Sequence, residues 1–507
     1  MITIMKTKAI YFIILFTLLF GVSCEDFLDK PIQGFQVSEN YFATEEECQR
    51  AVFGCYESLS PDDWWQLDFF WMIGDVCSDE AFKGNSIEGD QRDFGNLANF
   101  NIHSNNEWIE FKWLYTYATI SRCNLVIDKV PDSPASEENK KRFVAEAKFL
   151  RAFSYFELVK NFGGVPIILN EISAGDDVVQ RSSEEEVFAQ IEKDLKEASR
   201  GLPLKSEQTA ELIGSATKGA AHAFLAKAYV YQEKWAEAQT YSDSVISSGE
   251  YNLNDPFGDI WSVNNPNGNG SIFEIQQSFH DIYYIGTALP VLSRSRADGG
   301  WGFGTPSSYL EKAMEGDPRL RWTIIKQGDN VDADHSSYDT QLTENESGRI
   351  NRKYYLTYSE RPSKDEHLRS GLNHILFRYA DLLLLHAEIT YHNGSESESL
   401  LALNQLRTRI GFSPVNAGGT NLLNAIYTER QLELAMEGHR YYDLKRTGRL
   451  TEVIQDFYDY NQNRSTDPYD AGHNKGALFR PGVHELFPIP SSEIALSEYQ
   501  IQQNNGY

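Results

Sequence analysis

The sequence predicts a mainly α-helical protein in which antiparallel helix pairs of the tetratricopeptide type alternate with long irregular insertions. Three observations support this fold class. Several stretches combine a helix-start residue, helical periodicity and a glycine stop. Small and aromatic residues recur in two of these stretches at tetratricopeptide-like intervals. The segments between them are long and rich in Gly, Asn and aromatic residues. We therefore expect the helix pairs to stack into a right-handed superhelix.

The clearest helix is expected over residues 136–162. Ser136 is a suitable N-cap, two glutamates follow it, and the glycines at 163–164 end the pattern. Leu150 lies on one face of this helix, while Phe153 lies on another. A helix with two apolar faces is packed on both sides, as in stacked helix pairs.

Two repeat-like units follow the same plan. In residues 220–246, Ala226 allows two helices to approach closely, and aromatic residues follow it at regular intervals. Residues 382–412 again read as helix, short polar turn and helix. We expect helix pairs within about 45–60, 106–248 and 375–450.

The remaining stretches, about 60–101, 252–317 and 327–372, lack helical periodicity. Irregular segments of this length in a compact protein are usually functional, so they are the expected ligand surface.

The N-terminus reads as a lipoprotein signal peptide over residues 1–23. Lys6 and Lys8 precede fourteen uncharged residues, Ala9 to Val22, and Ser23 comes directly before Cys24. This apolar run is too short to span a bilayer comfortably. We expect cleavage before Cys24, a lipid anchor on that residue, and one mature domain over 24–507. An ordinary signal peptide with an incidental cysteine is the alternative.

Charge and cysteine content exclude some partners. The formal net charge is −27, and removal of Lys6 and Lys8 makes it −29. Such a surface repels nucleic acid and anionic headgroups, so membrane attachment must come from the lipid. The other four cysteines have no metal-type spacing, and we expect them to be small buried hydrophobes. They are Cys48, Cys55, Cys77 and Cys123.

Four segments, in order, resemble the SusD/RagB family of outer-membrane nutrient-binding lipoproteins. They are FWMIGDVCSDEAFKG (70–84), AEAKFLRAFSYFELVKNFGGVPII (145–168), ERQLELAMEGHRYYDLKRTGRL (429–450) and LFPIPSSEIALSEYQIQQNNGY (486–507). The resemblance covers nearly the whole chain from Cys24 onward. It departs from the family pattern at Gly164, where Asp is usual, and at Ser497-Glu498, where Asn-Pro is usual.

The resemblance implies a SusD-like fold and a function. Members cap a TonB-dependent outer-membrane barrel of the SusC type at the cell surface and deliver an oligosaccharide, or sometimes a peptide, to it. They are not enzymes and carry no cofactor. The acidic residues Glu25 and Asp26 after Cys24 are similar to the surface-export tag of Bacteroidetes lipoproteins.

Glycan binding requires exposed aromatic rings for the C–H faces of sugars, with polar side chains beside them for the hydroxyls. Three clusters in the insertions meet this requirement: Trp64-Trp65, Phe94, and Tyr283-Tyr284 with Trp301. Trp301 is the strongest candidate because flanking glycines would leave its ring uncovered. Each of these rings could instead belong to the core.

Other motifs read as structural. Glu437, Arg440 and Asp443 have helical i,i+3 spacing and are expected to form an internal network. Arg151 is expected to be the buried partner of an acid. The acidic stretch 329–334 lacks the glycine and final glutamate of an EF-hand, so no metal is predicted.

Two rival classes remain open, and neither fits as well. A secreted glycoside hydrolase is disfavoured by the repeats and by the absence of catalytic motifs. A protein-only tetratricopeptide scaffold would not need aromatic-rich insertions.

Overall fold

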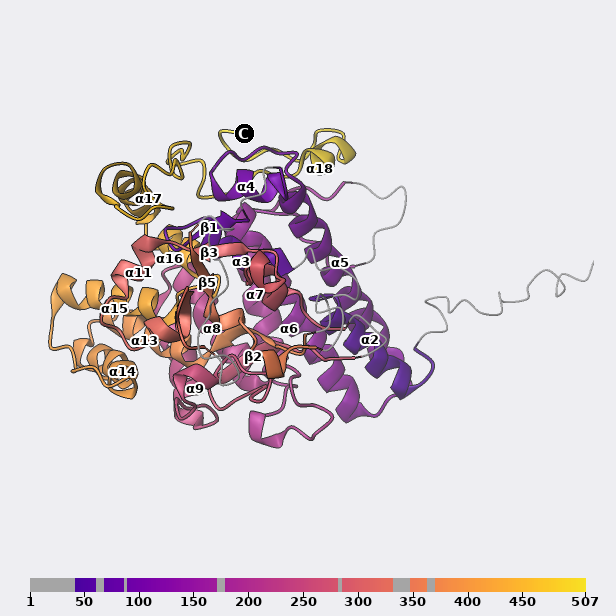
Figure 1. Ribbon diagram of the computed structural model, residues 1–507. Coiled ribbons are helices and arrows are strands. Elements are labelled where there is room, and N and C mark those ends of the chain that lie inside the picture. The colour runs from indigo at the N-terminus through magenta and orange to yellow at the C-terminus, as the bar shows by residue number, and fades with distance from the viewer. Residues whose placement is uncertain are drawn as a thin grey trace, which may run out of the picture.

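The computed structural model describes residues 42–60, 68–85, 89–170, 178–280, 285–331, 347–362 and 370–507, and within them the predicted mainly α-helical fold is confirmed (Figure 1). The helices are α2 (Glu45–Glu57), α3 (Phe69–Val76), α4 (Arg92–Ala98), α5 (Glu107–Lys129), α6 (Glu137–Phe162), α7 (Glu184–Ala198), α8 (Lys218–Tyr231), α9 (Trp235–Ser248), α10 (Leu289–Ser293), α11 (Ser308–Ala313), α12 (Leu320–Thr323), α13 (Tyr379–His392), α14 (Glu396–Arg409), α15 (Gly419–Leu434), α16 (Arg440–Arg446), α17 (Leu450–Asp459) and α18 (Ser491–Leu496). The strands are β1 (Ala81–Gly84), β2 (Ser271–Ile275), β3 (Phe303–Pro306), β4 (Ile324–Lys326), β5 (Arg349–Asn351) and β6 (His374–Arg378).

The long helices form a stacked spine. Helices α5 to α9 pack on one another in chain order, and α9 then packs on α13, which is followed by α14 and α15. In Figure 1 the spine runs from α2 and α5 on one side of the molecule to α14 and α15 on the other. Helix α6 begins at the Ser136 cap, ends at Gly163 with φ +71°, and contacts α2, α5 and α7. It is therefore packed on both sides, as predicted.

The three predicted insertions contain more regular structure than expected. Helices α3 and α4 lie in 60–101, and α10 and α11 lie in 252–317, so the reading of these stretches as non-helical is wrong in part. Seven of the eight residues of α3 are buried, and a short helix buried all round has no amphipathic period to reveal it. Among the described residues the strands form three two-stranded antiparallel sheets: β1 with β3, β2 with β6, and β4 with β5.

The predicted internal charge network exists, but its pairs differ from the expected ones. Glu437 lies in the loop before α16, so it does not share a helix with Arg440. Arg440 instead pairs with Asp79, at 2.8 Å, on the segment between α3 and β1. Glu437 accepts from Arg378, at 2.7 Å, and from the buried Lys353, at 2.6 Å. The network therefore joins parts of the chain that are distant in sequence.

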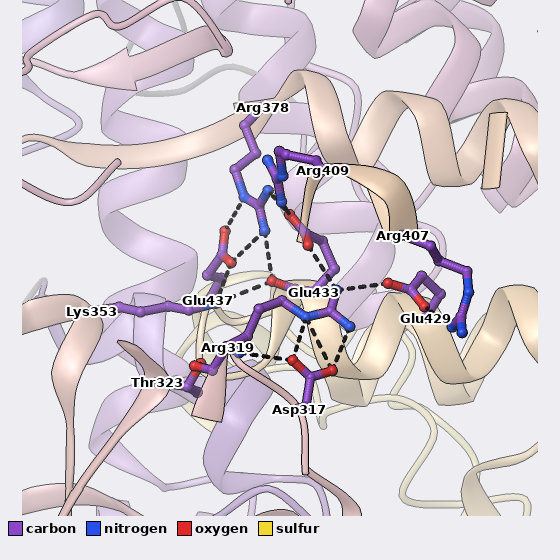
Figure 2. A network of polar contacts seen from close by, with 10 residues as sticks. All are labelled: Asp317, Arg319, Thr323, Lys353, Arg378, Arg407, Arg409, Glu429, Glu433 and Glu437. Atoms are coloured by element: carbon purple, nitrogen blue, oxygen red, sulfur yellow. Dashed lines mark hydrogen bonds and ion pairs between the residues drawn. The ribbon is translucent and has the colours of Figure 1, made fainter. Parts of the chain in front are cut away.

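Glu433 lies at the centre of this network (Figure 2). Its carboxylate accepts hydrogen bonds from Arg378 at 2.6 Å, Arg409 at 2.6 Å and Arg319 at 2.8 Å. Burial alone would raise the pKa of Glu433, but the three guanidinium groups hold it well below the usual range. Arg319 is itself 1% exposed and also binds Asp317. Each buried charge in this group thus has an opposite charge beside it.

The C-terminal segment is fastened to α6. The Phe487 N–H donates to the Asn161 carbonyl at 2.8 Å. The Asn504 side-chain amide donates to the carbonyls of Phe162 and Phe487, at 2.9 and 2.7 Å. Ile489, between the two prolines of the Pro-Ile-Pro motif, is fully buried. This arrangement pins the chain end to the body of the protein.

Other structural expectations also hold. Arg151 forms a buried double hydrogen bond to Asp194, with both distances 2.8 Å. The four cysteines after Cys24 are buried free thiols. Within the described part of the chain, no helix combines the length and apolar character needed to cross a membrane.

Candidate functional site

All three predicted insertions meet at the short helix α10. Strand β1 from the first insertion pairs with β3 from the second. The Asp68 carboxylate, at the start of α3, accepts the N–H of Ala288 at 2.6 Å. Thr287, just before α10, forms an antiparallel bridge with Ser370 from the third insertion. Segments separated by up to 300 residues therefore contribute to one surface.

Trp301 is held on this surface by a tight turn that follows α10. Its backbone N–H donates to the Val291 carbonyl at 2.7 Å, and the Gly302 N–H donates to the Arg294 carbonyl at 2.8 Å. A Cβ at Gly300 would lie 2.2 Å from that same carbonyl oxygen, so this position requires glycine. Gly300 therefore serves the turn itself. The Trp301 ring is half-buried and packs partly on the core.

Asp298, in the same turn, organises a second aromatic residue. Its carboxylate accepts the Tyr358 hydroxyl at 2.9 Å and two N–H groups of Arg361 at 3.0 and 2.8 Å. The Arg361 guanidinium lies 4.0 Å from the centre of the Tyr358 ring, while 45% of Tyr358 is exposed. Partial burial, together with the Asp298 carboxylate, raises the pKa of the Tyr358 hydroxyl. The Tyr358 side chain is thus held in place by Asp298 and Arg361 but remains partly accessible to solvent.

Phe279 adds a third ring beside the start of α10. It follows Ser278, whose N–H donates to the Ile285 carbonyl at 3.1 Å, and it is 46% exposed. A Cβ at Gly371 would lie 3.3 Å from the Phe279 nitrogen, so the third insertion packs against this turn. We define the α10 surface by five residues from the second and third insertions: Phe279, Asp298, Trp301, Tyr358 and Arg361.

The chemistry of the α10 surface suits a sugar. Partly exposed rings offer faces for C–H stacking, and the buried Asp298–Arg361 pair holds the Tyr358 hydroxyl in place. No group of three or more His, Cys, Asp or Glu in the described ranges has a metal-binding arrangement. Asp329 accepts the Lys326 N–H at 2.7 Å, while the remaining acids of that predicted loop, Asp332 and Asp334, lie outside the described residues.

The predicted site residues have different outcomes. The prediction that Phe94 is an exposed ring is wrong. Phe94 is 0% exposed, and its ring centre lies 4.6 Å from that of Phe69 and 5.9 Å from that of Trp108. Its apolar ring contributes more when packed between α3 and α5 than when exposed to water. Five further predicted residues lie outside the described residues: the lipid-anchor Cys24 and the aromatic candidates Trp64, Trp65, Tyr283 and Tyr284.

Tyr358 and its partner Arg361 are not among the site residues predicted from the sequence. Both lie in the predicted insertion 327–372, in the stretch LTYSERP (356–362), where an aromatic ring stands among polar residues. The criterion that selected Trp301 would also have selected Tyr358. The pairing with Asp298 could not be read from the sequence, since sixty residues separate the two.

A larger hollow lies elsewhere, between α5 and α18, with a volume of about 460 Å³. Trp113, Leu114 and Tyr117 line one side, and Leu496 and Ile501 line the other. Most of its walls are apolar, and Glu493 is one of few polar groups. A glycan, whose hydroxyls each need a partner, fits the α10 surface better.

Comparisons with known proteins decide the family. The model of the SusD family matches residues 235–507, which is more than half of the chain. The chain belongs to the SusD family. A second family model, described as "Starch-binding associating with outer membrane", matches residues 70–230. SusD-like protein P38 of Formosa agariphila is 27% identical, over 90% of this chain and 95% of the relative.

Solved SusD-like structures share the fold. A laminarin-binding SusD-like protein has a TM-score of 0.76 with 27% identity, and the match covers 92% of this chain and all of that one. Surface glycan-binding protein A from Bacteroides fluxus has a TM-score of 0.75 with 26% identity, over the same shares of the two chains. The predicted SusD-like fold is therefore confirmed.

Proposed function

We propose that this SusD-family chain is a non-enzymatic glycan-binding lipoprotein of the outer-membrane surface. The observation that carries this proposal is the α10 surface, where the second and third insertions bring partly exposed aromatic rings together. The similarity to a laminarin-binding SusD-like protein supports an oligosaccharide as the ligand. In this proposal Trp301 and Tyr358 stack against sugar rings, and polar groups at the edges of the surface bind the sugar hydroxyls.

The anchor and the partner are also part of the proposal. Residues 1–23 act as a signal peptide, Cys24 carries the lipid, and residues 24–507 form one domain. The family description "associating with outer membrane" supports this location. The protein then caps a SusC-like TonB-dependent barrel and delivers the oligosaccharide to it. Peptide binding is the alternative within the same family.

Calorimetric titration of the purified full chain in detergent tests the proposal. The titrants are laminarin, starch, mannan, xylan, polygalacturonate and alginate, with casein peptides as the alternative ligand. Wild-type protein should bind at least one glycan. Trp301→Ala and Tyr358→Ala should each weaken that binding about tenfold, which corresponds to about 1.4 kcal/mol.

Tyr499→Ala is the matched control, because Tyr499 is 74% exposed and lies near the C-terminus, outside the α10 surface. It should bind like wild type. Binding that survives both α10 substitutions would place the glycan elsewhere on the protein. Binding of peptides and of no glycan would overturn the glycan proposal.

A further inference from the structure

Three arginines of the described chain lie in, or bind, the turn that carries Trp301, and each is already bound to an acidic group of the protein. We infer that the α10 surface takes an uncharged glycan, and that Asp298 sets this selectivity by withholding arginine side chains from acidic ligands. The inference rests on the proposed function and adds the chemical class of the ligand. Asp298 acts here through the arginines, and is therefore a specificity-determining residue.

Arg361 is the arginine whose guanidinium lies over the Tyr358 ring, and its donors are occupied. Its Nε donates to the Leu356 carbonyl at 3.0 Å, and its terminal nitrogens donate to both oxygens of Asp298 and to the Tyr355 hydroxyl. The Arg361 side chain is only 7% exposed. A carboxylate or sulfate on a sugar could reach this guanidinium only by displacing Asp298.

Arg294 is held in the same way. Its side chain is 4% exposed, its Nε donates to the Asp298 carbonyl at 2.8 Å, and the Asp298 carboxylate lies 3.5 Å away. Asp298 therefore neutralises two guanidinium groups at once. Separating a buried charge from its partner is strongly unfavourable, so these pairs do not open for a surface ligand.

Arg296 is more accessible, with 29% of its side chain exposed, but it too is paired. It donates to Asp90 at 2.7 Å and to the Asn85 side-chain oxygen at 2.9 Å. The surrounding field adds to this effect, because the protein carries a formal net charge of −27. A polyanionic glycan is repelled by that field, whereas an uncharged one is not.

An uncharged sugar fits what these pairs leave available. The Asp298 carboxylate is only 3% exposed, whereas the Asp90 carboxylate, which accepts from Arg296, is 29% exposed and has lone pairs for a hydroxyl donor. Stacking on Trp301 and Tyr358 needs no charge on the ligand. The α10 surface thus offers ring faces, but no uncompensated cation among its described residues.

The test compares one glycan with and without negative charge. The uncharged titrant is laminarin, starch, mannan or xylan, whichever binds most tightly, and the charged titrant is its chemically sulfated derivative. We expect wild-type protein to bind the sulfated form at least about tenfold more weakly. In Asp298→Asn, which releases Arg294 and Arg361 from their carboxylate, the affinity ratio of sulfated to unsulfated glycan should rise about tenfold.

Two further variants complete the test. Asp128→Asn makes the same charge change at an exposed site on α5, where 61% of the side chain is accessible, and should leave the ratio unchanged. Asp90→Asn, which releases the more exposed Arg296, should raise the ratio without disturbing a buried pair. It keeps the test valid if Asp298→Asn fails to fold.

The outcomes separate the two proposals. Equal or tighter binding of sulfated glycan, alginate or polygalacturonate by wild-type protein overturns the inference while leaving a glycan-binding function intact. If Asp298→Asn and Asp90→Asn change the affinity ratio of sulfated to unsulfated glycan no more than Asp128→Asn does, the role of the paired acids is overturned. Failure to bind any glycan, charged or uncharged, overturns the proposed function and the inference with it.

Discussion

Glu433 illustrates how single residues stabilise this protein. Its carboxylate is 0% exposed and accepts from three arginines that come from different parts of the chain. A buried pair of this kind adds little relative to an apolar core, but the loss of one partner leaves uncompensated charge in a low-dielectric interior. The stability of the fold therefore depends on keeping this carboxylate ionised.

Glu433→Gln should lower the free energy of unfolding by roughly 3–5 kcal/mol at neutral pH. The amide removes the negative charge and directs N–H groups toward guanidinium donors. Since the pKa of Glu433 is depressed in the folded state, its contribution is complete above its unfolded value of 4.5 and is lost as the pH falls through the folded value.

Urea unfolding followed by tryptophan fluorescence measures this effect. Glu46→Gln is the control, because Glu46 forms an exposed i,i+4 pair with Arg50 and 81% of its side chain is accessible. The control should change the free energy of unfolding by less than about 0.5 kcal/mol. A Glu433→Gln variant as stable as this control would contradict the role given to the network.

Helix α3 shows how one short element positions the site. It contacts the loop before α16 on one side, and through Asp68 it holds the start of α10 on the other. Gly74 of α3 approaches the Gly438 backbone so closely that a Cβ would lie 1.9 Å from the Gly438 oxygen. The Gly438 N–H also donates to Asp75 at 2.7 Å. The element is fixed by backbone contact as much as by side-chain packing.

Gly74→Ala should therefore destabilise the protein by several kcal/mol, since backbone atoms must move to admit one methyl group. Gly54→Ala in α2 is the matched control. Nothing lies within 4 Å of a Cβ at Gly54, so the same substitution should stabilise by about 0.5–1 kcal/mol through helix propensity. Thermal unfolding of both variants distinguishes these effects. Equal melting temperatures would contradict the close approach of α3 and the α16 loop.

Asp68 should make the stability of this region depend on pH. Burial raises the pKa of Asp68 from 3.8 to about 7, although the Ala288 N–H opposes this shift. Between these values the folded state binds more protons than the unfolded state, so the contribution of Asp68 is complete below pH 3.8 and is lost as the pH rises toward 7.

Asp68→Asn removes this ionisation and keeps an oxygen acceptor for Ala288. Its free energy of unfolding, relative to wild type, should increase from pH 4 to pH 7 with a slope of at most about 1.4 kcal/mol per pH unit. Urea unfolding at pH 4, 5.5, 7 and 8 measures this difference. A difference that is constant with pH would show that Asp68 is ionised throughout.

At the scale of the whole molecule, the C-terminal segment fastens onto α6, which belongs to the N-terminal part of the spine. Arg181 donates to the Gln502 carbonyl at 2.7 Å and to the Asn504 side chain at 2.8 Å, in addition to the contacts of Phe487. In Figure 1 the C-terminal helix α18 lies beside one end of α5. The C-terminal segment is thus joined to α6 and Arg181, in the N-terminal half of the described chain, by hydrogen bonds.

Removal of residues 487–507 should lower the melting temperature by at least about 5 °C, because it exposes the apolar surface that Phe487 and Ile489 cover. Differential scanning calorimetry measures the change. Leu496→Ala is the control, since Leu496 is 76% exposed and its loss removes little packing. A truncated chain that melts with the control would contradict the role of this segment.

The sequence predicted the spine well and the site only in part. Caps, glycine stops and tetratricopeptide-like spacing are local signals, and helices such as α6 follow them closely. Short buried helices such as α3 lack those signals, because all their faces are apolar. Trp301 could be found as an aromatic among small and polar residues, whereas Phe94, chosen on the same criterion, belongs to the core. Pairing between Asp298 and Arg361 depends on tertiary contacts that no local pattern encodes.

Contacts between distant residues also govern how fast the molecule can form. Arg440 bonds Asp79, 361 residues away, and Lys475 donates to the Val76 carbonyl, 399 residues away. Closing such long loops costs chain entropy before any stabilising contact forms, so topologies of this kind fold slowly. Helix α3 cannot reach its native surroundings until α16 and the segment around Lys475 are available. A refolding experiment should therefore show early formation of the α5–α9 helices and a later, slower phase in which the α10 surface is assembled.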